Sequence, residues 1–160
     1  IRFNAFGNCR SLTSITISDG VTSIGDYAFN ECSSLTNIAL PSNLTSIGGF
    51  AFYNCTNLSS VTLPTNLTTI VYSAFSDCTS LTSITIPDGV TSIGGFAFAN
   101  CNSLTNVTVE ATTPPSLGQD VFVATSSSLV IYVPAESVEA YKTATNWSEY
   151  ASRIQAIPSS

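Results

Sequence analysis

Apolar residues recur along this chain with a period of 23 residues. The clearest column is cysteine, and several other apolar columns keep the same spacing. The cysteines are Cys9, Cys32, Cys55, Cys78 and Cys101, and the phenylalanines are Phe6, Phe29, Phe52, Phe75 and Phe98. Because these columns share one register over five units, the sequence predicts a stack of structural repeats.

Each unit predicts one strand followed by short turns. In residues 12–17, Ile15 and Ile17 alternate with polar neighbours, which is the period of a β-strand. A proline such as Pro64 then ends the strand, because it cannot donate to the ladder. A second extended piece is expected at 22–24, and the Ala28–Phe29 step predicts a single helical or 3-10 turn.

One unit cannot enclose its own apolar face, but stacked units can. Each column then meets its copy about 4.8 Å further along the axis. We therefore predict a β-rich solenoid of the α/β class, built as a right-handed coil of 23-residue repeats. It should have one parallel sheet, short helical or 3-10 turns opposite, and a C-terminal helical cap.

The chain of 160 residues is expected to be a single domain, 1–160. Its predicted parts are a partial repeat at 1–11, four full repeats at 12–103, degenerate final repeats at 104–134 and a cap at 135–160. Because the first residues already lie inside a repeat, we expect the chain to belong to a longer protein. An apolar edge at 1–17 would then be exposed, which favours self-association at the uncapped N-terminal end.

Charge limits the possible partners. Charged residues make up only 9% of the chain, its net charge is −6, and residues 11–109 contain no Lys or Arg. Phosphate recognition needs clustered basic side chains, so nucleic acid is excluded as a partner. No run of 18 apolar residues occurs, so direct membrane insertion is not expected.

The residue types needed for catalysis are scarce. The chain has no His, its carboxylates are scattered over turns, and no glycine-rich phosphate loop or calcium loop is present. We therefore predict no catalytic, cofactor-binding or metal-binding residue, no cofactor and no enzyme activity.

The cysteine column has three interpretations. Metal binding would need paired cysteines or histidines, and disulfides between stacked neighbours would leave one of five cysteines over. The third interpretation, which we favour, is a column of free, buried thiols, because Cys packs as a small hydrophobe.

The outward strand positions are the candidate binding face. They are Ser14, Thr16, Asn37, Ser60, Thr62, Ser83, Thr85, Asn106 and Thr108. This face either recognises a protein or glycan, or is a solvated sheet whose Thr and Asn side chains bond to one another. An array for binding ice is a third interpretation, which the mixed Ser/Asn column disfavours. The face lacks the Trp, Tyr and Arg that dominate protein-binding hot spots.

A second candidate surface is an aromatic column next to the Ala-Phe step. It comprises Phe3, Tyr27, Phe50, Tyr72 and Phe96. Half-exposed rings there would anchor a partner, or they would lie over the neighbouring unit and close the edge of the core.

The segment CTSLTSITIPDGVTSIGGFAFANC, residues 78–101, resembles the BspA-like leucine-rich-repeat proteins. These proteins are common on the surface of gut and oral Bacteroidetes and of some protozoa. The segment LVIYVPAESVEAYKTATNWSEYASRIQAI is similar to the closing segment of bacterial members. The resemblance implies a leucine-rich-repeat solenoid that is extracellular or attached to the cell surface, with partners such as host matrix proteins or neighbouring cells.

The functional hypothesis is a non-enzymatic, adhesin-like module that binds a protein or a glycan. The alternative is a structural spacer that displays another domain of a longer surface protein.

Overall fold

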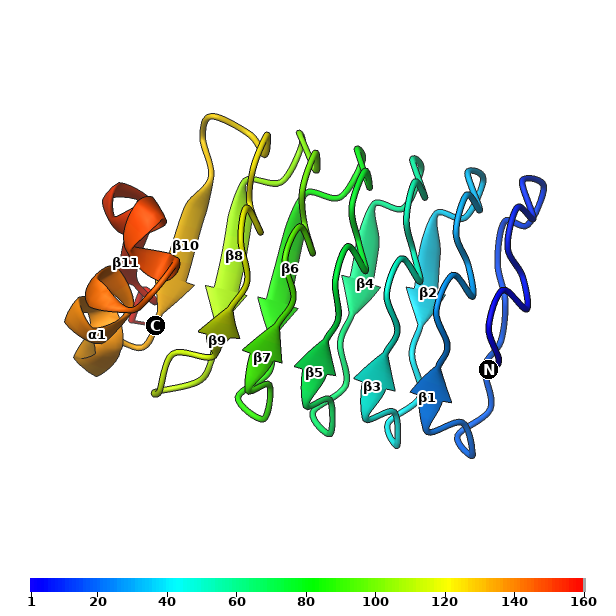
Figure 1. Cartoon of the computed structure of the whole chain (residues 1–160), viewed down its shortest axis with the longest axis horizontal. Helices are drawn as coiled ribbons and strands as arrows, with labels where there is room; N and C mark the ends of the chain where they lie inside the picture. The colour runs from blue at the N-terminus through cyan, green and yellow to red at the C-terminus, as the bar shows by residue number, and fades with distance from the viewer. Residues whose placement is uncertain (160) are drawn as a thin grey trace.

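The computed structural model describes residues 1–159 as a solenoid of stacked coils. Figure 1 shows the coils side by side along the long axis, with the N-terminus at one end and helices closing the other. Equivalent residues of successive coils pair in register, for example Ile47 with Ile70 and Ile70 with Ile93. The predicted solenoid of 23-residue coils is confirmed.

The strands lie in two rows rather than in the one sheet that the sequence predicts (Figure 1). One row is a five-stranded parallel sheet of β1 (Ser23–Ile24), β3 (Ser46–Ile47), β5 (Thr69–Ile70), β7 (Ser92–Ile93) and β9 (Ser116–Leu117). The extended piece at 22–24 thus pairs with its copies, because stacking brings each backbone within hydrogen-bond reach of the next, as from Thr45 N to Thr22 O at 2.9 Å.

The other row contains two parallel sheets. The first consists of β2 (Asn37–Ala39) and β4 (Ser60–Thr62), and the second of β6 (Ser83–Ile86), β8 (Asn106–Val109), β10 (Val130–Val133) and β11 (Ile154–Ala156). A single bridge extends the first sheet from Ala39 to Thr16. The row is therefore interrupted between β4 and β6.

The Ala28–Phe29 step is not helical, which corrects the prediction of a helical or 3-10 turn. Tyr27 and Glu31 have left-handed backbone conformations, each with φ of 58°. The amide of Phe29 donates to Ala51 O of the next coil at 2.8 Å, whereas that of Ala28 donates to Gly25 O at 3.2 Å. Because alternate amides bond between coils, a continuous helical hydrogen-bond pattern cannot form.

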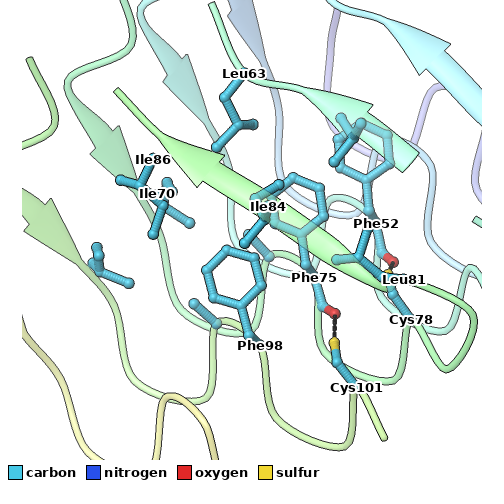
Figure 2. Close-up of a cluster of buried hydrophobic side chains, with 14 of the residues drawn as sticks. Phe52, Leu63, Ile70, Phe75, Cys78, Leu81, Ile84, Ile86, Phe98 and Cys101 are labelled. Carbon is cyan, nitrogen blue, oxygen red and sulfur yellow. Dashed lines mark hydrogen bonds between the residues drawn. The ribbon is translucent and has the colours of Figure 1, made fainter. Parts of the chain in front are cut away.

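Phenylalanine rings form the centre of the core. Phe52 and Phe75 stack with 5.1 Å between their ring centroids, and Phe75 and Phe98 with 5.5 Å. Figure 2 shows these three rings above one another, with Leu81 and Ile84 beside them. The predicted inward orientation of the phenylalanine column is confirmed for Phe29, Phe52, Phe75 and Phe98, which are all fully buried.

The C-terminal segment covers the last coil. It comprises η1 (Ala135–Ser137), α1 (Val138–Thr143), η2 (Trp147–Arg153) and β11. Trp147 Nε1 donates to Pro115 O at 2.8 Å, and Tyr141 Oη donates to Ala111 O at 2.6 Å. Both side chains are buried, and Trp147 lies 6.3 Å from Phe122 between ring centroids. The helical cap predicted from the sequence is present, although it ends in a strand.

At the other end, apolar side chains of the first coil are only partly buried. Ile1, Phe6, Leu12, Ile15 and Ile17 pack against the core but keep some exposed surface. Their copies in the second coil, such as Phe29 and Leu35, are fully buried.

Candidate binding surfaces

The predicted strand face is exposed and in register. β2 and β4 align Asn37 with Ser60, and β6 and β8 align Ser83 with Asn106 and Thr85 with Thr108. Eight of the nine predicted residues are exposed, and Thr108 is half-buried. The alternation places their apolar neighbours inside, since β6 reads exposed-buried-exposed-buried.

The polar groups of this face are free. Within residues 1–159, none of the nine side chains takes part in a hydrogen bond. Bonds between coils are made instead by other columns, for example from Thr68 Oγ1 to Thr45 O at 3.2 Å. The interpretation in which Thr and Asn side chains of the face bond to one another is therefore not what the structure shows.

Two open hollows lie on either side of β4. The hollow between β2 and β4 has a volume of about 450 Å³ and that between β4 and β6 about 390 Å³. Ser60, Val61, Thr62 and Thr65 line both hollows. The second hollow coincides with the interruption between β4 and β6, and Glu110 adds a carboxylate to its wall.

The sequence interpretation missed one aromatic residue on this face. Tyr132 in β10 pairs with Thr108 in β8, which continues the outward column beyond the predicted residues. Its side chain is half-buried. The alternation of 129–133 gave the signal, but the altered repeat length before this strand hid its alignment with the earlier strands.

The aromatic column forms a continuous surface strip. Tyr27 and Phe50 stack with their ring centroids 4.9 Å apart, and Tyr72 lies 5.5 Å from both Phe50 and Phe96. Phe3 is 69% exposed and Tyr72 47% exposed. The rings thus lie over those of neighbouring coils, as the second interpretation expects, and their outer parts face solvent; that they anchor a partner stays a prediction.

The cysteines are free, and four of them are fully buried. Sγ of Cys55 donates to Phe29 O at 3.1 Å, and Sγ of Cys101 donates to Phe75 O at 3.1 Å (Figure 2). Burial raises the pKa of the thiols of both Cys55 and Cys101 to about 12. Cys9 in the first coil is only half-buried, so the expected column of buried thiols includes four members rather than five.

Charged side chains are sparse along residues 1–159, since they make up only 9% of the chain. No group of three or more Cys, Asp or Glu side chains is placed to hold a metal ion there. The one salt bridge in that part of the chain joins Arg10 to Glu31. None of its helices is long and apolar enough to cross a bilayer.

Stacked coils of 23 residues, each with a buried leucine just before a strand, such as Leu35 before β2 and Leu58 before β4, define a leucine-rich-repeat solenoid. The chain belongs to the BspA type leucine rich repeat family, which matches residues 1–129 in six copies. A comparison with curated proteins finds no match.

Solved bacterial structures share this fold. A leucine rich repeat protein of T. pallidum is 28% identical, with a TM-score of 0.70 over 79% of this chain and 60% of its own. A leucine rich cell surface protein of Faecalibacterium prausnitzii is 30% identical, with a TM-score of 0.61; the match covers 92% of this chain and 32% of that protein. The pneumococcal vaccine antigen PcpA is 21% identical, with a TM-score of 0.65; the match covers 90% of this chain and 40% of that protein. This likeness supports the shared fold and nothing further. This chain thus spans between about a third and three fifths of these proteins.

Proposed function

We propose that this chain is a non-enzymatic, adhesin-like module that binds a protein or glycan through its strand face. The observation that carries the proposal is the set of nine outward side chains, whose hydroxyl and amide groups bond to nothing else within residues 1–159. A ligand that meets such groups gains hydrogen bonds without breaking any within the protein. The hollows on either side of β4 provide concave places for a ligand's own polar groups.

The setting that we propose is the outside of a bacterial cell. The support comes from the family and from the Faecalibacterium relative, which is described as a cell surface protein. Partners there would be matrix proteins, glycans or proteins of neighbouring cells.

A binding screen tests the proposed function. The purified chain should bind at least one member of a panel of matrix proteins, glycans and bacterial surface proteins. The double variant T62E/T85E places two carboxylates on the strand face and should abolish that binding. The control N57E/N102E adds the same charge at exposed turn positions and should leave it intact. Silence across the whole panel would contradict the proposal and favour a structural spacer, and equal loss in both variants would place the binding elsewhere.

A further inference from the structure

One coil departs from the repeat at its surface. The flanking coils carry Gly-Gly-Phe at 48–50 and 94–96, whereas this coil carries Val71, Tyr72 and Ser73. The departure adds two large apolar side chains to the surface, because Val71 is 37% and Tyr72 47% exposed. Among residues 1–159 few other large apolar side chains are as exposed, and the repeat itself does not require these two.

The departure also removes a hydrogen bond. Gly25, Gly48, Gly94 and Gly118 each donate their amide to the preceding coil, for example from Gly94 N to Ile70 O at 2.7 Å. Within residues 1–159, the amide of Val71 makes no such bond. A sequence that exposes apolar surface and gives up a backbone hydrogen bond gains nothing in stability, which is typical of residues kept for function.

The neighbouring coils leave space around these side chains. Gly49 and Gly95 leave room beside Val71 and Tyr72, since a Cβ on Gly49 would lie 3.7 Å from Val71 Cγ1 and one on Gly95 would lie 3.5 Å from Tyr72 Cδ2. The Tyr72 ring is tilted by 52° to Phe50 and by 59° to Phe96, and so its neighbours cover its faces less than they would in a parallel stack. Tyr is among the residues that dominate interaction hot spots.

A carboxylate lies beside the same spot. A Cβ placed on Gly49 would lie 3.7 Å from Cγ1 of Val71 and 3.8 Å from Oδ1 of Asp26. Oδ1 accepts a hydrogen bond from Gly49 N at 2.8 Å, and this fixes the carboxylate. Among residues 1–159, the other oxygen, Oδ2, has no hydrogen-bond partner. An apolar group and a fixed carboxylate thus both lie close to Gly49, and the partly exposed Tyr72 ring follows Val71 in the chain.

We propose that Val71, Tyr72 and Asp26 form a docking point for a lysine or arginine side chain of a basic segment in a partner protein. Val71 and the Tyr72 ring would contact the aliphatic stem and the cation, and Asp26 would pair with the charge. Charge complementarity supports this partner, because residues 11–109 contain no cation and the chain carries a net charge of −6. The docking point lies after β5 and uses none of the strand-face residues, so it does not depend on the function proposed above.

Calorimetric titration with a synthetic peptide tests this docking point. The probe is a 12-residue peptide of alternating Arg and Ser, and its control replaces every Arg with Gln. The triple variant V71G/Y72G/S73F restores the sequence of the flanking coils, so it should fold as those coils do. It should lower the affinity for the Arg peptide at least about tenfold at 150 mM NaCl. D26N should lower that affinity about threefold, in line with the loss of one partly exposed charge pair. T62A/T85A on the strand face should leave it unchanged.

Four results would overturn the docking point. The first is equal affinity of the parent and the triple variant for the Arg peptide, and the second is equal affinity of the parent for the Arg and Gln peptides. The third is no binding of the Arg peptide at millimolar concentration. A glycan that binds the parent but not the triple variant, with no response to the peptide, would also overturn it by assigning this surface to sugars.

Discussion

At the scale of the residue, each buried cysteine contacts the coil before its own. The thiol fills an apolar position and also donates to a phenylalanine carbonyl oxygen, at 3.2 Å from Cys78 to Phe52 O. An apolar environment disfavours the thiolate, so burial raises the pKa of Cys32 to about 11 and that of Cys55 from 9.0 to about 12. These residues are placed for packing rather than for nucleophilic or redox chemistry.

We predict that the free energy of unfolding falls as the pH rises above about 9. Because the folded-state pKa of Cys55 is raised above its unfolded value, the stabilisation is fully present below pH 9.0 and is lost toward about pH 12. Each such thiol contributes a slope of up to about 1.4 kcal/mol per pH unit. Urea unfolding between pH 8 and 11 measures the slope, and Cys55→Ala should make it shallower. A slope that is unchanged in Cys55→Ala would contradict this assignment.

At the scale of the element, the sequence predicts the long strands well and the turns poorly. Alternation marks the strand at 83–86, and Pro87 marks its end, as the structure shows. The second row of strands was not predicted as a sheet, because two-residue strands such as β3 carry no period of their own. Their pairing follows only from the stacking of coils. The turn at Ala28–Phe29 was predicted wrongly because bonds between coils replace those of a helix.

The glycines that follow the two-residue strands, such as Gly48 after β3, are required because neighbouring coils approach closely there, not because of their backbone conformation. No glycine of residues 1–159 has a positive φ. A Cβ on Gly48 would lie 2.6 Å from Asp26 N and 2.7 Å from Gly25 C, whereas one on Gly20 would meet nothing within 4 Å. We predict that Gly48→Ala lowers the free energy of unfolding by about 1–3 kcal/mol through overpacking. Gly20→Ala, the matched control, should raise it by up to about 1 kcal/mol. Urea denaturation measures both changes, and equal effects would exclude close approach as the cause.

At the scale of the whole molecule, the residues of the candidate binding face could be predicted from the sequence, but the shape of the surface that they form could not. The outward positions from Ser14 to Thr108 follow from alternation alone. The hollows beside β4 and the contribution of Tyr132 depend on how neighbouring coils are spaced and on where the degenerate repeats resume their register. The docking point at Tyr72 was visible only as a departure from the repeat, and its carboxylate neighbour comes from a different coil.

The cap should control the stability of the adjacent coils. Trp147 is buried against Phe122 and donates to Pro115 O. We predict that Trp147→Ala lowers the free energy of unfolding by about 3–5 kcal/mol, whereas Trp147→Phe, which keeps a ring but loses the N–H, costs about 1 kcal/mol. Because each coil contacts only its neighbours, hydrogen exchange in Trp147→Ala should accelerate first in β8 and β10. Uniform acceleration along the chain would contradict nearest-neighbour coupling.

The alternating amides of the Ala-Phe turn have one further consequence. Every coil there presents carbonyl groups to one neighbour and amide groups to the other, in the same arrangement each time. A whole 23-residue segment can therefore be duplicated or excised without leaving a mismatched junction, whereas a change of another size, such as the one extra residue between Phe98 and Phe122, has to be absorbed within a turn for the rings to stay stacked. Changes in the length of such proteins should accordingly come in whole coils, and each added coil would lengthen the displayed surface by one further step.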